Sequence, residues 1–238
     1  MIRGIYTGAA GMSVKKTWLE VVSNNLANAN TAGFKKDVVA FRNLIDSNNF
    51  FVDENQGGTG VETVVTDFSQ GALRETGNPF DLSIDGKGFF VLSDGTEQSY
   101  SRDGHFQLNA EGVLVGPRGL PVQGENGDIV ITDNDFSVNR NGEIFSNGKL
   151  IDKLQILDFP PGALEKAGNN LYSLKPNAPE PLSVQSQIIQ GHLEEANINV
   201  VEEMVNLIML SRSFNDNQKM IQTQDDTLRR AVQDLGRV

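Results

Sequence analysis

Apolar residues recur at every seventh position at both ends of this chain, and the long stretch between the two ends lacks the pattern. The series are Ile5, Met12, Leu19 and Leu26 near the start, and Val200, Leu207, Phe214, Ile221, Leu228 and Leu235 near the end. A seven-residue period places an apolar stripe along one side of a helix, and such a stripe requires a partner helix. We therefore predict terminal helices that pack against each other or against copies in neighbouring subunits, a layout typical of an assembling part and not of an enzyme.

The sequence also indicates where these helices begin and end. The first is expected over about residues 4–28 and ends in a turn at 28–33, because Asn and Gly tolerate the left-handed conformation that terminates helices. The second is expected to be capped by Asn199, with Glu202 three residues on. It continues without Pro or Gly to Gly236, about 37 residues or roughly 55 Å. We expect the second position of its seam to be polar, at Ser211, Gln218 and Asp225.

Short strands are predicted between about residues 61 and 190. Turn dipeptides such as Asp85-Gly86, Asp94-Gly95, Asn126-Gly127 and Asn141-Gly142 separate apolar runs there. This pattern is typical of an antiparallel sandwich or barrel-like domain. The predicted fold class is α+β, with terminal helices forming a coiled-coil-like region around an inserted antiparallel all-β domain. The predicted limits are 1–45 with 191–238 for the helical assembly domain, 46–60 for a loop or linker, and 61–190 for the β-rich outer domain.

Charge and composition exclude several classes of partner. The net charge of −11 argues against binding to nucleic acid or to an anionic membrane surface. Residues 1–45 hold six basic and two acidic side chains, whereas residues 191–238 hold five basic and eight acidic ones, so the two predicted helical ends are oppositely charged. We expect no lipid-embedded segment, because no run approaches the ~18 apolar residues that cross a bilayer. No secretory signal is visible in residues 1–17, so we expect any export to use a route without a cleaved signal.

Signals of catalysis, metal binding or cofactor binding are weak. The chain has no Cys, and its two histidines, His105 and His192, are not paired at a metal-ligand spacing. No nucleophile elbow or phosphate-binding loop occurs. Many of the aspartates sit beside turn glycines, where Asp is favoured by the backbone alone. We therefore predict no catalytic residues, no metal and no cofactor.

Three stretches resemble known sequence signatures. Residues 23–35, which include Asn24, Asn25, Asn28, Thr31, Gly33, Phe34 and Lys35, resemble the N-terminal signature of bacterial flagellar rod and hook proteins. Residues 190–199, with Glu203-Met204 and 212–214, resemble the C-terminal block of that family, apart from Ala196 where Ser is more usual. In the middle, residues 67–71, 81–90 and 99–104 resemble its β domain. The likeness covers nearly the whole chain.

This resemblance implies a structural subunit of the flagellar basal-body rod. Members of the family leave the cell through the flagellar type III export apparatus without a cleaved signal and stack helically into a tube in the periplasmic space. Their terminal helices form the inner wall, and the rod transmits torque from motor to hook. The implied partners are other copies of the chain, other rod subunits and the export apparatus.

The compact stretch Gly119–Ile129 and the short chain look more like a proximal than a distal rod subunit. A distal rod protein of the same family is the alternative. A surface adhesin or binding module, and a peptidoglycan-cutting enzyme, are the rival classes.

Overall fold

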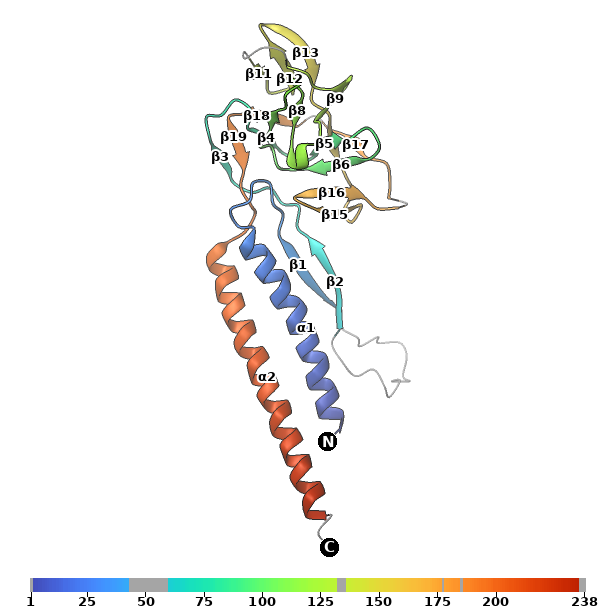
Figure 1. Ribbon diagram of the computed structural model, residues 1–238, viewed down its shortest axis with the longest axis vertical. Coiled ribbons are helices and arrows are strands. Elements are labelled where there is room, and N and C mark those ends of the chain that lie inside the picture. Colours follow the sequence, from blue (N-terminus) through green and yellow to red (C-terminus); the bar gives the residue numbers. More distant parts are fainter. Residues whose placement is uncertain (1, 43–59, 132–135, 177, 185, 236–238) are drawn as a thin grey trace. The chain divides into compact units, whose positions relative to one another are not determined.

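The computed structural model describes residues 2–42, 60–131, 136–176, 178–184 and 186–235 (Figure 1). The fold mixes helices with sheets, and each strand pair in these ranges is antiparallel. The chain divides into two compact units. The helical unit holds residues 1–27, 36–67 and 198–238, and the β-rich unit holds residues 28–35 and 68–197.

The helical unit is built on two long helices, α1 (Ile2–Ala27) and α2 (Val200–Leu235). They run antiparallel, side by side (Figure 1). Lys15 of α1 bonds Ser213 of α2, and Gly11 lies near Asn217, so residues earlier in α1 lie against residues later in α2. The predicted start of α2 is confirmed, because the Asn199 side-chain oxygen accepts a hydrogen bond from the Glu202 backbone N–H at 3.3 Å.

A two-stranded ribbon completes the helical unit. β1 (Asp37–Arg42) pairs with β2 (Gly60–Thr66), with Val38 opposite Val65 and Val39 opposite Val64. Val39 is buried, whereas the other three valines are exposed, so the ribbon has little apolar cover of its own. The predicted linker, 46–60, lies outside the described residues apart from Gly60.

The β-rich unit contains short strands around one six-stranded sheet. Its sheet order is β15–β16–β6–β5–β14–β17. These strands are β5 (Phe89–Ser93), β6 (Gln98–Ser101), β14 (Ile156–Asp158), β15 (Leu164–Gly168), β16 (Leu171–Leu174) and β17 (Leu182–Ser183). The smaller sheets pair β3 (Leu73–Glu75) with β19 (His192–Glu194), β4 (Leu82–Asp85) with β18 (Gln187–Gln190), β7 (Gln107–Leu108) with β8 (Leu114–Val115), and β9 (Gln123–Gly124) with β10 (Gly127–Asp128). A three-stranded sheet joins β11 (Phe136–Val138), β12 (Glu143–Ser146) and β13 (Lys149–Lys153), and a 3-10 turn, η1, spans Pro117–Gly119.

Strand β5 lies between two apolar clusters. Its side chains alternate, so Phe90 and Leu92 join the larger cluster, while Phe89 and Val91 join the smaller one with Tyr100 and its neighbours. A strand covered on both faces explains why four consecutive residues of this run are apolar. It is the central strand that the sequence pattern predicted most directly.

The structure refines several expectations. Two of the apolar runs between the predicted turns are only partly strands: residues 105–108 form a strand at Gln107–Leu108, and residues 153–157 are divided between β13 and β14. The described part of the chain has two long helices, so a coiled-coil-like arrangement of several helices is not confirmed. The predicted domain limits remain a prediction. By contacts, β2 belongs to the helical unit, and the β-rich unit includes residues 28–35.

Candidate functional site

One side of α2 is covered along most of the helix. Partly or fully buried side chains recur there at alternating spacings of three and four residues: Val200, Glu203, Leu207, Leu210, Phe214, Asn217, Ile221 and Gln224, with Asn206 and Ser213 partly buried beside them. Of the predicted apolar positions, Val200, Leu207, Phe214 and Ile221 lie in this seam. The predicted polar positions were wrong, because Ser211, Gln218 and Asp225 are exposed. The second seam residue comes three places after the first and not four, which keeps it on the side of the helix that faces α1.

The contribution of α1 to the seam is similar in kind. Met12, Leu19 and Leu26 are half-buried. The side chains of Ile5, Leu228 and Leu235 lie outside those that the structure describes. That these heptad positions also pack between subunits stays a prediction.

Polar groups occupy the seam where the helices meet the ribbon. Asn25 is 1% exposed and forms a hydrogen bond with the Glu203 side chain. Burial raises the pKa of Glu203, while the Asn25 hydrogen bond and the charge of Lys36 act in the opposite direction. Among the described side chains, Glu203 Oε2 and Gln224 Oε1 are buried without a hydrogen-bond partner. A seam with such acceptors is weaker than an all-apolar one.

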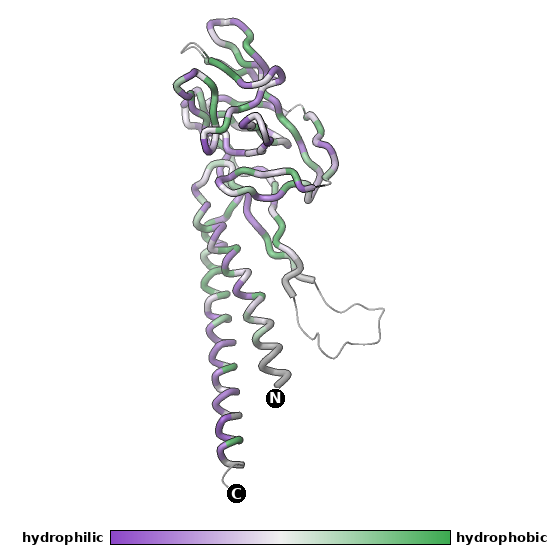
Figure 2. The backbone as a smooth tube through the Cα atoms, turned by 45° about the vertical axis from the view of Figure 1, so that its right-hand side comes forward, coloured by the Kyte–Doolittle hydropathy of each residue, from purple (hydrophilic) through white to green (hydrophobic). Residues whose placement is uncertain are grey.

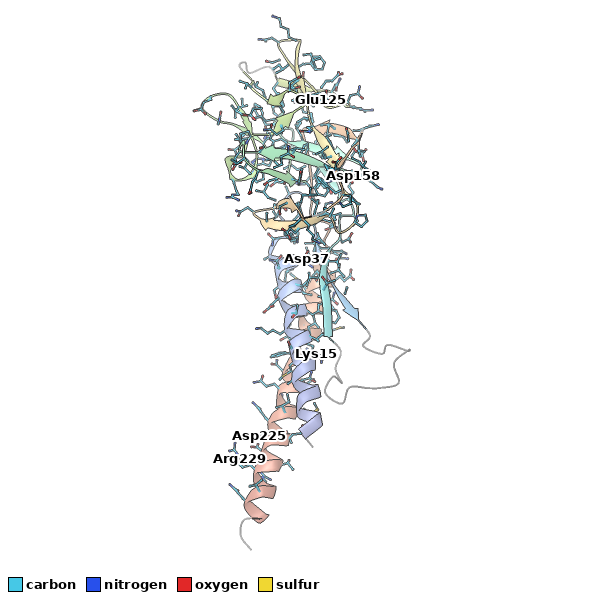
Figure 3. All side chains as sticks on the ribbon, turned by 90° about the vertical axis from the view of Figure 1, so that its right-hand side faces the viewer. Lys15, Asp37, Glu125, Asp158, Asp225 and Arg229 are labelled. Carbon is cyan, nitrogen blue, oxygen red and sulfur yellow. The ribbon has the colours of Figure 1, made fainter. Side chains whose placement is uncertain are left out.

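A second apolar stripe on α2 is exposed. We call the residues Val201, Met204, Val205, Ile208 and Met209 the outer stripe; their exposed fractions run from 44% to 71%. At 100° per residue they lie nearly opposite the seam. Figure 2 shows that apolar residues gather in the first part of α2, whereas its later part is mainly hydrophilic. The later part carries exposed ion pairs such as Asp225–Arg229, at 3.3 Å (Figure 3).

Analysis of the heptads missed the outer stripe. Its signal is present in the sequence as apolar residues at i, i+3, i+4, i+7 and i+8 from Val201. The stripe was hidden because the seam residues interleave with it, so α2 reads as apolar on most sides over its first three turns. Exposed apolar groups in a contiguous patch mark an interaction surface.

The N-terminal motif residues perform distinct local roles. In the helical unit, the Asn25 side chain donates to the Asp37 carbonyl and accepts from the Asp37 N–H, both at 2.9 Å. In the β-rich unit, the Thr31 backbone N–H donates to the Asn28 carbonyl at 3.0 Å, and Phe34 is buried. Asn24 is exposed at the end of α1.

Gly33 is required by its surroundings. Its φ is +65°, which L side chains rarely adopt, and its N–H donates to the Glu194 carbonyl at 2.7 Å. A Cβ at this position would lie 2.3 Å from the carbonyl carbon of Arg102. Residue 33 therefore has neither the conformational freedom nor the space for a side chain.

Lys35, Arg102 and Glu194 form a buried charge cluster. Lys35 Nζ lies 2.5 Å from Glu194 Oε1, and Arg102 Nη1 lies 3.1 Å from Glu194 Oε2. The exposed fractions of the three side chains are 0%, 4% and 1% in sequence order. Burial lowers the pKa of the Arg102 guanidinium, and the Glu194 carboxylate opposes that shift.

Backbone groups add hydrogen bonds to the cluster, although Arg102 Nε is buried without a partner. Glu194 Oε1 also accepts from the Gly71 N–H at 2.9 Å, and Lys35 Nζ donates to the Ser69 carbonyl at 2.7 Å. Arg102 Nη2 donates to the Gly86 carbonyl at 2.6 Å. Buried ionic groups are tolerated when they are paired and hydrogen-bonded in this way. Sequence analysis placed Lys35 in a motif but gave no role to Arg102 or Glu194, although both lie within stretches it had singled out.

Other polar groups of the described residues form local pairs. His105 Nδ1 lies 2.8 Å from Asp81 Oδ1, and burial raises the pKa of the nearby Asp103. Within the described ranges, no three or more acidic or histidine side chains gather as metal ligands. An open groove of about 630 Å³ beside β14 and β17 is lined by side chains of both charges, including Arg140 and Glu143. None of the helices in the described ranges is long and apolar enough to cross a membrane.

Three family matches cover the start, middle and end of the chain. Residues 5–35 match the family described as flagella basal body rod protein, residues 83–146 match the flagellar hook protein FlgE/F/G D1 domain, and residues 189–234 match the flagellar basal body rod FlgEFG protein C-terminal. The flagellar basal-body rod protein FlgG of Bacillus subtilis strain 168 is 31% identical over 98% of both chains. FlgF of Caulobacter vibrioides is 32% identical over 100% of both, and FlgG of Buchnera aphidicola subsp. Schizaphis graminum is 34% identical over 98% of this chain and 100% of its own. The chain belongs to the flagellar basal-body rod protein family.

Membership of the rod family agrees with the geometry of the buried cluster. Lys35 lies in the first matched segment, Arg102 in the second and Glu194 in the third, so each segment contributes one charged group. Family membership makes the chain a structural protein of the flagellar basal-body rod, which acts in motility and assembles with other rod components. It gives no support to a surface adhesin.

Proposed function

We propose that this chain is a subunit of the proximal rod that polymerises helically through its terminal helices. The polymer would form the wall of the export channel, pass torque along the rod and span the periplasmic space. The chain would reach its place through the flagellar type III export apparatus, without a cleaved signal. The observation that carries this proposal is the outer stripe of α2, an exposed apolar surface within the C-terminal family match.

The outer stripe supports self-assembly through both its position and its chemistry. Val201 and Met209 are 71% and 63% exposed, and covering such side chains with a neighbouring helix stabilises the assembly by removing apolar surface from water. The α1–α2 seam already occupies the opposite side of α2, so a helix from another subunit has this face available. The predicted heptad residues would then hold the helix pair together, while the outer stripe joins pairs into a coiled-coil-like wall.

Charge favours contact between unlike helices of neighbouring subunits. Residues 2–27 hold three basic and one acidic side chain, and residues 200–235 hold four basic and six acidic ones. A positive α1 facing a negative α2 of another copy is attracted, whereas two α2 helices face to face repel each other. Individual exposed pairs contribute only about 0.2–1 kcal/mol, so charge selects the partner and apolar burial supplies the affinity.

The choice of proximal over distal rod rests on the compact stretch Gly119–Ile129. The relatives given above that are named FlgG are 31–34% identical to this chain, and the one named FlgF is 32% identical. Sequence identity therefore does not favour one of these named relatives over the other. The alternative is a distal rod protein of the same family.

The test is to find the subunit in the rod. A tagged chain replaces the native copy in its own host, basal bodies are purified, and the tag is located along the rod axis by electron microscopy. A tag at the motor end supports the proximal assignment, and a tag at the hook end assigns the chain to the distal rod. Absence of the tag from basal bodies would overturn both.

A further inference from the structure

The segment Asn28–Lys35, called the strap here, docks into the β-rich unit largely through polar contacts, with Gly33, Phe34 and Lys35 buried. In the sequence it lies between α1 and β1, which belong to the helical unit. Asn170 Nδ2 donates to the Ala32 carbonyl at 2.6 Å, and Lys166 Nζ donates to the Lys35 carbonyl at 3.0 Å. Lys166 Nζ also lies 4.5 Å from the centre of the Phe34 ring. With the bond from Gly33 to Glu194, these contacts are largely polar, and Phe34 is the single large apolar anchor.

The charge cluster links the strap to groups outside it. Lys35 of the strap shares the Glu194 carboxylate with Arg102, and Arg102 is also attracted by the Asp158 carboxylate. Arg102 and Glu194 bond each other, Gly86 and Gly71 without using any strap residue. Burying the Lys35 ammonium group costs several kcal/mol of hydration, which its bonds to Glu194 and to the Ser69 carbonyl offset. We therefore expect the rest of the unit to stay folded when the strap leaves.

A clamp in the helical unit holds the two ends of the strap. The paired hydrogen bonds between the Asn25 side chain and the Asp37 backbone join residues 12 positions apart and enclose the strap in the loop between them. Closing the base of a loop removes conformational freedom that docking would otherwise have to remove. An intact clamp therefore makes docking of the strap more favourable.

We propose that the strap is a conformational coupler, in which ordering of the Asn25–Asp37 clamp in the helical unit promotes docking of the strap in the β-rich unit. Because coupling between two ordering events is reciprocal, docking of the strap also stabilises the clamp. The coupling passes through the covalent chain. It holds for the free chain in solution and does not depend on the function proposed above.

Hydrogen exchange of the full-length chain tests the coupling with the variant Asn25→Ala. We expect exchange to rise about 5- to 100-fold at the Gly33 amide, which bonds Glu194, and at the β3–β19 amides beside it. The amides of β11–β13 should keep their protection, because these strands form a sheet of their own, separate from β3–β19.

Two controls separate coupling from general damage. Ser23→Ala changes an exposed residue of α1, two positions from Asn25, and should leave all these amides unchanged. Glu203→Gln alters the other hydrogen-bond partner of Asn25 and should leave Gly33 protected. Far-UV circular dichroism reports whether α1 and α2 persist in each variant.

Each remaining outcome overturns the proposal. Unchanged Gly33 exchange in Asn25→Ala means that the strap docks independently of the clamp, even if that variant loses helix. A uniform rise that includes β11–β13 means global unfolding and not release of the strap.

Discussion

Replacing Ile208 and Met209 together with Gln is expected to weaken self-association of this chain by roughly 30- to 150-fold. Fully burying an Ile or Met side chain contributes about 1.5–3 kcal/mol. Ile208 is 53% and Met209 is 63% exposed in the single chain, so a neighbour can cover a little over half of each. The double change therefore removes about 2–3 kcal/mol from each contact, at tenfold per 1.4 kcal/mol.

The choice of Gln keeps the helix itself intact, because Gln, Ile and Met differ little in helix propensity. The assay is the critical concentration for polymer formation, measured by sedimentation, with far-UV circular dichroism of the monomer at the same temperature. The control is Val232→Gln, which changes a residue that is 68% exposed on α2 but lies outside the outer stripe. The reasoning is refuted if the double variant polymerises at the wild-type concentration, or if Val232→Gln weakens polymerisation equally.

Three further outcomes are expected. Gly33→Ala should destabilise the β-rich unit in urea by about 2 kcal/mol or more beyond Gly77→Ala, which has a similar positive φ but open space around it; equal losses would show that the predicted clash relaxes away. Leu210→Ala should lower the thermal stability of the helix pair by about 2–4 kcal/mol because Leu210 is only 7% exposed, and a loss no larger than that of Val205→Ala would contradict the seam. Burial raises the folded-state pKa of Glu203 above its usual 4.5, so protonation of Glu203 stabilises the helix pair, and this stabilisation is lost as pH rises through the folded pKa. The melting temperature of the helices should therefore rise on acidification toward pH 4.5, and Glu203→Gln should remove this pH dependence. An unchanged pH dependence in Glu203→Gln would assign it to another group.

The helices were predictable because their signals are local. The cap at Asn199 and the heptad positions along α2 are read within a few residues of each other. The same reading misplaced the second seam position and overlooked the outer stripe, because two stripes on one helix interleave in the sequence. Ile208 in the outer stripe and Leu207 in the seam differ in exposure because α1 covers one face of α2. The sequence of α2 alone does not predict which face is covered.

The buried cluster was not predictable for a different reason. Lys35, Arg102 and Glu194 are separated by 67 and 92 positions, and no periodicity connects residues so far apart. Each of them is a charged residue in a stretch that resembles the family, which marks the stretch but not the contact. The pairing of β3 with β19 places Glu194, the Gly33 N–H bonds the Glu194 carbonyl beside Lys35, and Arg102 directly follows β6, so long-range pairing brings the three together. The short strands were similarly predictable in character but not in pairing.

The position of Glu194 between two cations bears on how sequences of this kind can change over generations. Losing the carboxylate alone leaves two positive charges buried together, and losing either cation alters the balance around the other; breaking a buried pair costs about 3–5 kcal/mol. Replacing all three by apolar residues is close to neutral, but it requires simultaneous changes at three distant places in the gene. We therefore expect the effects of substitutions in these three stretches on stability to depend on one another.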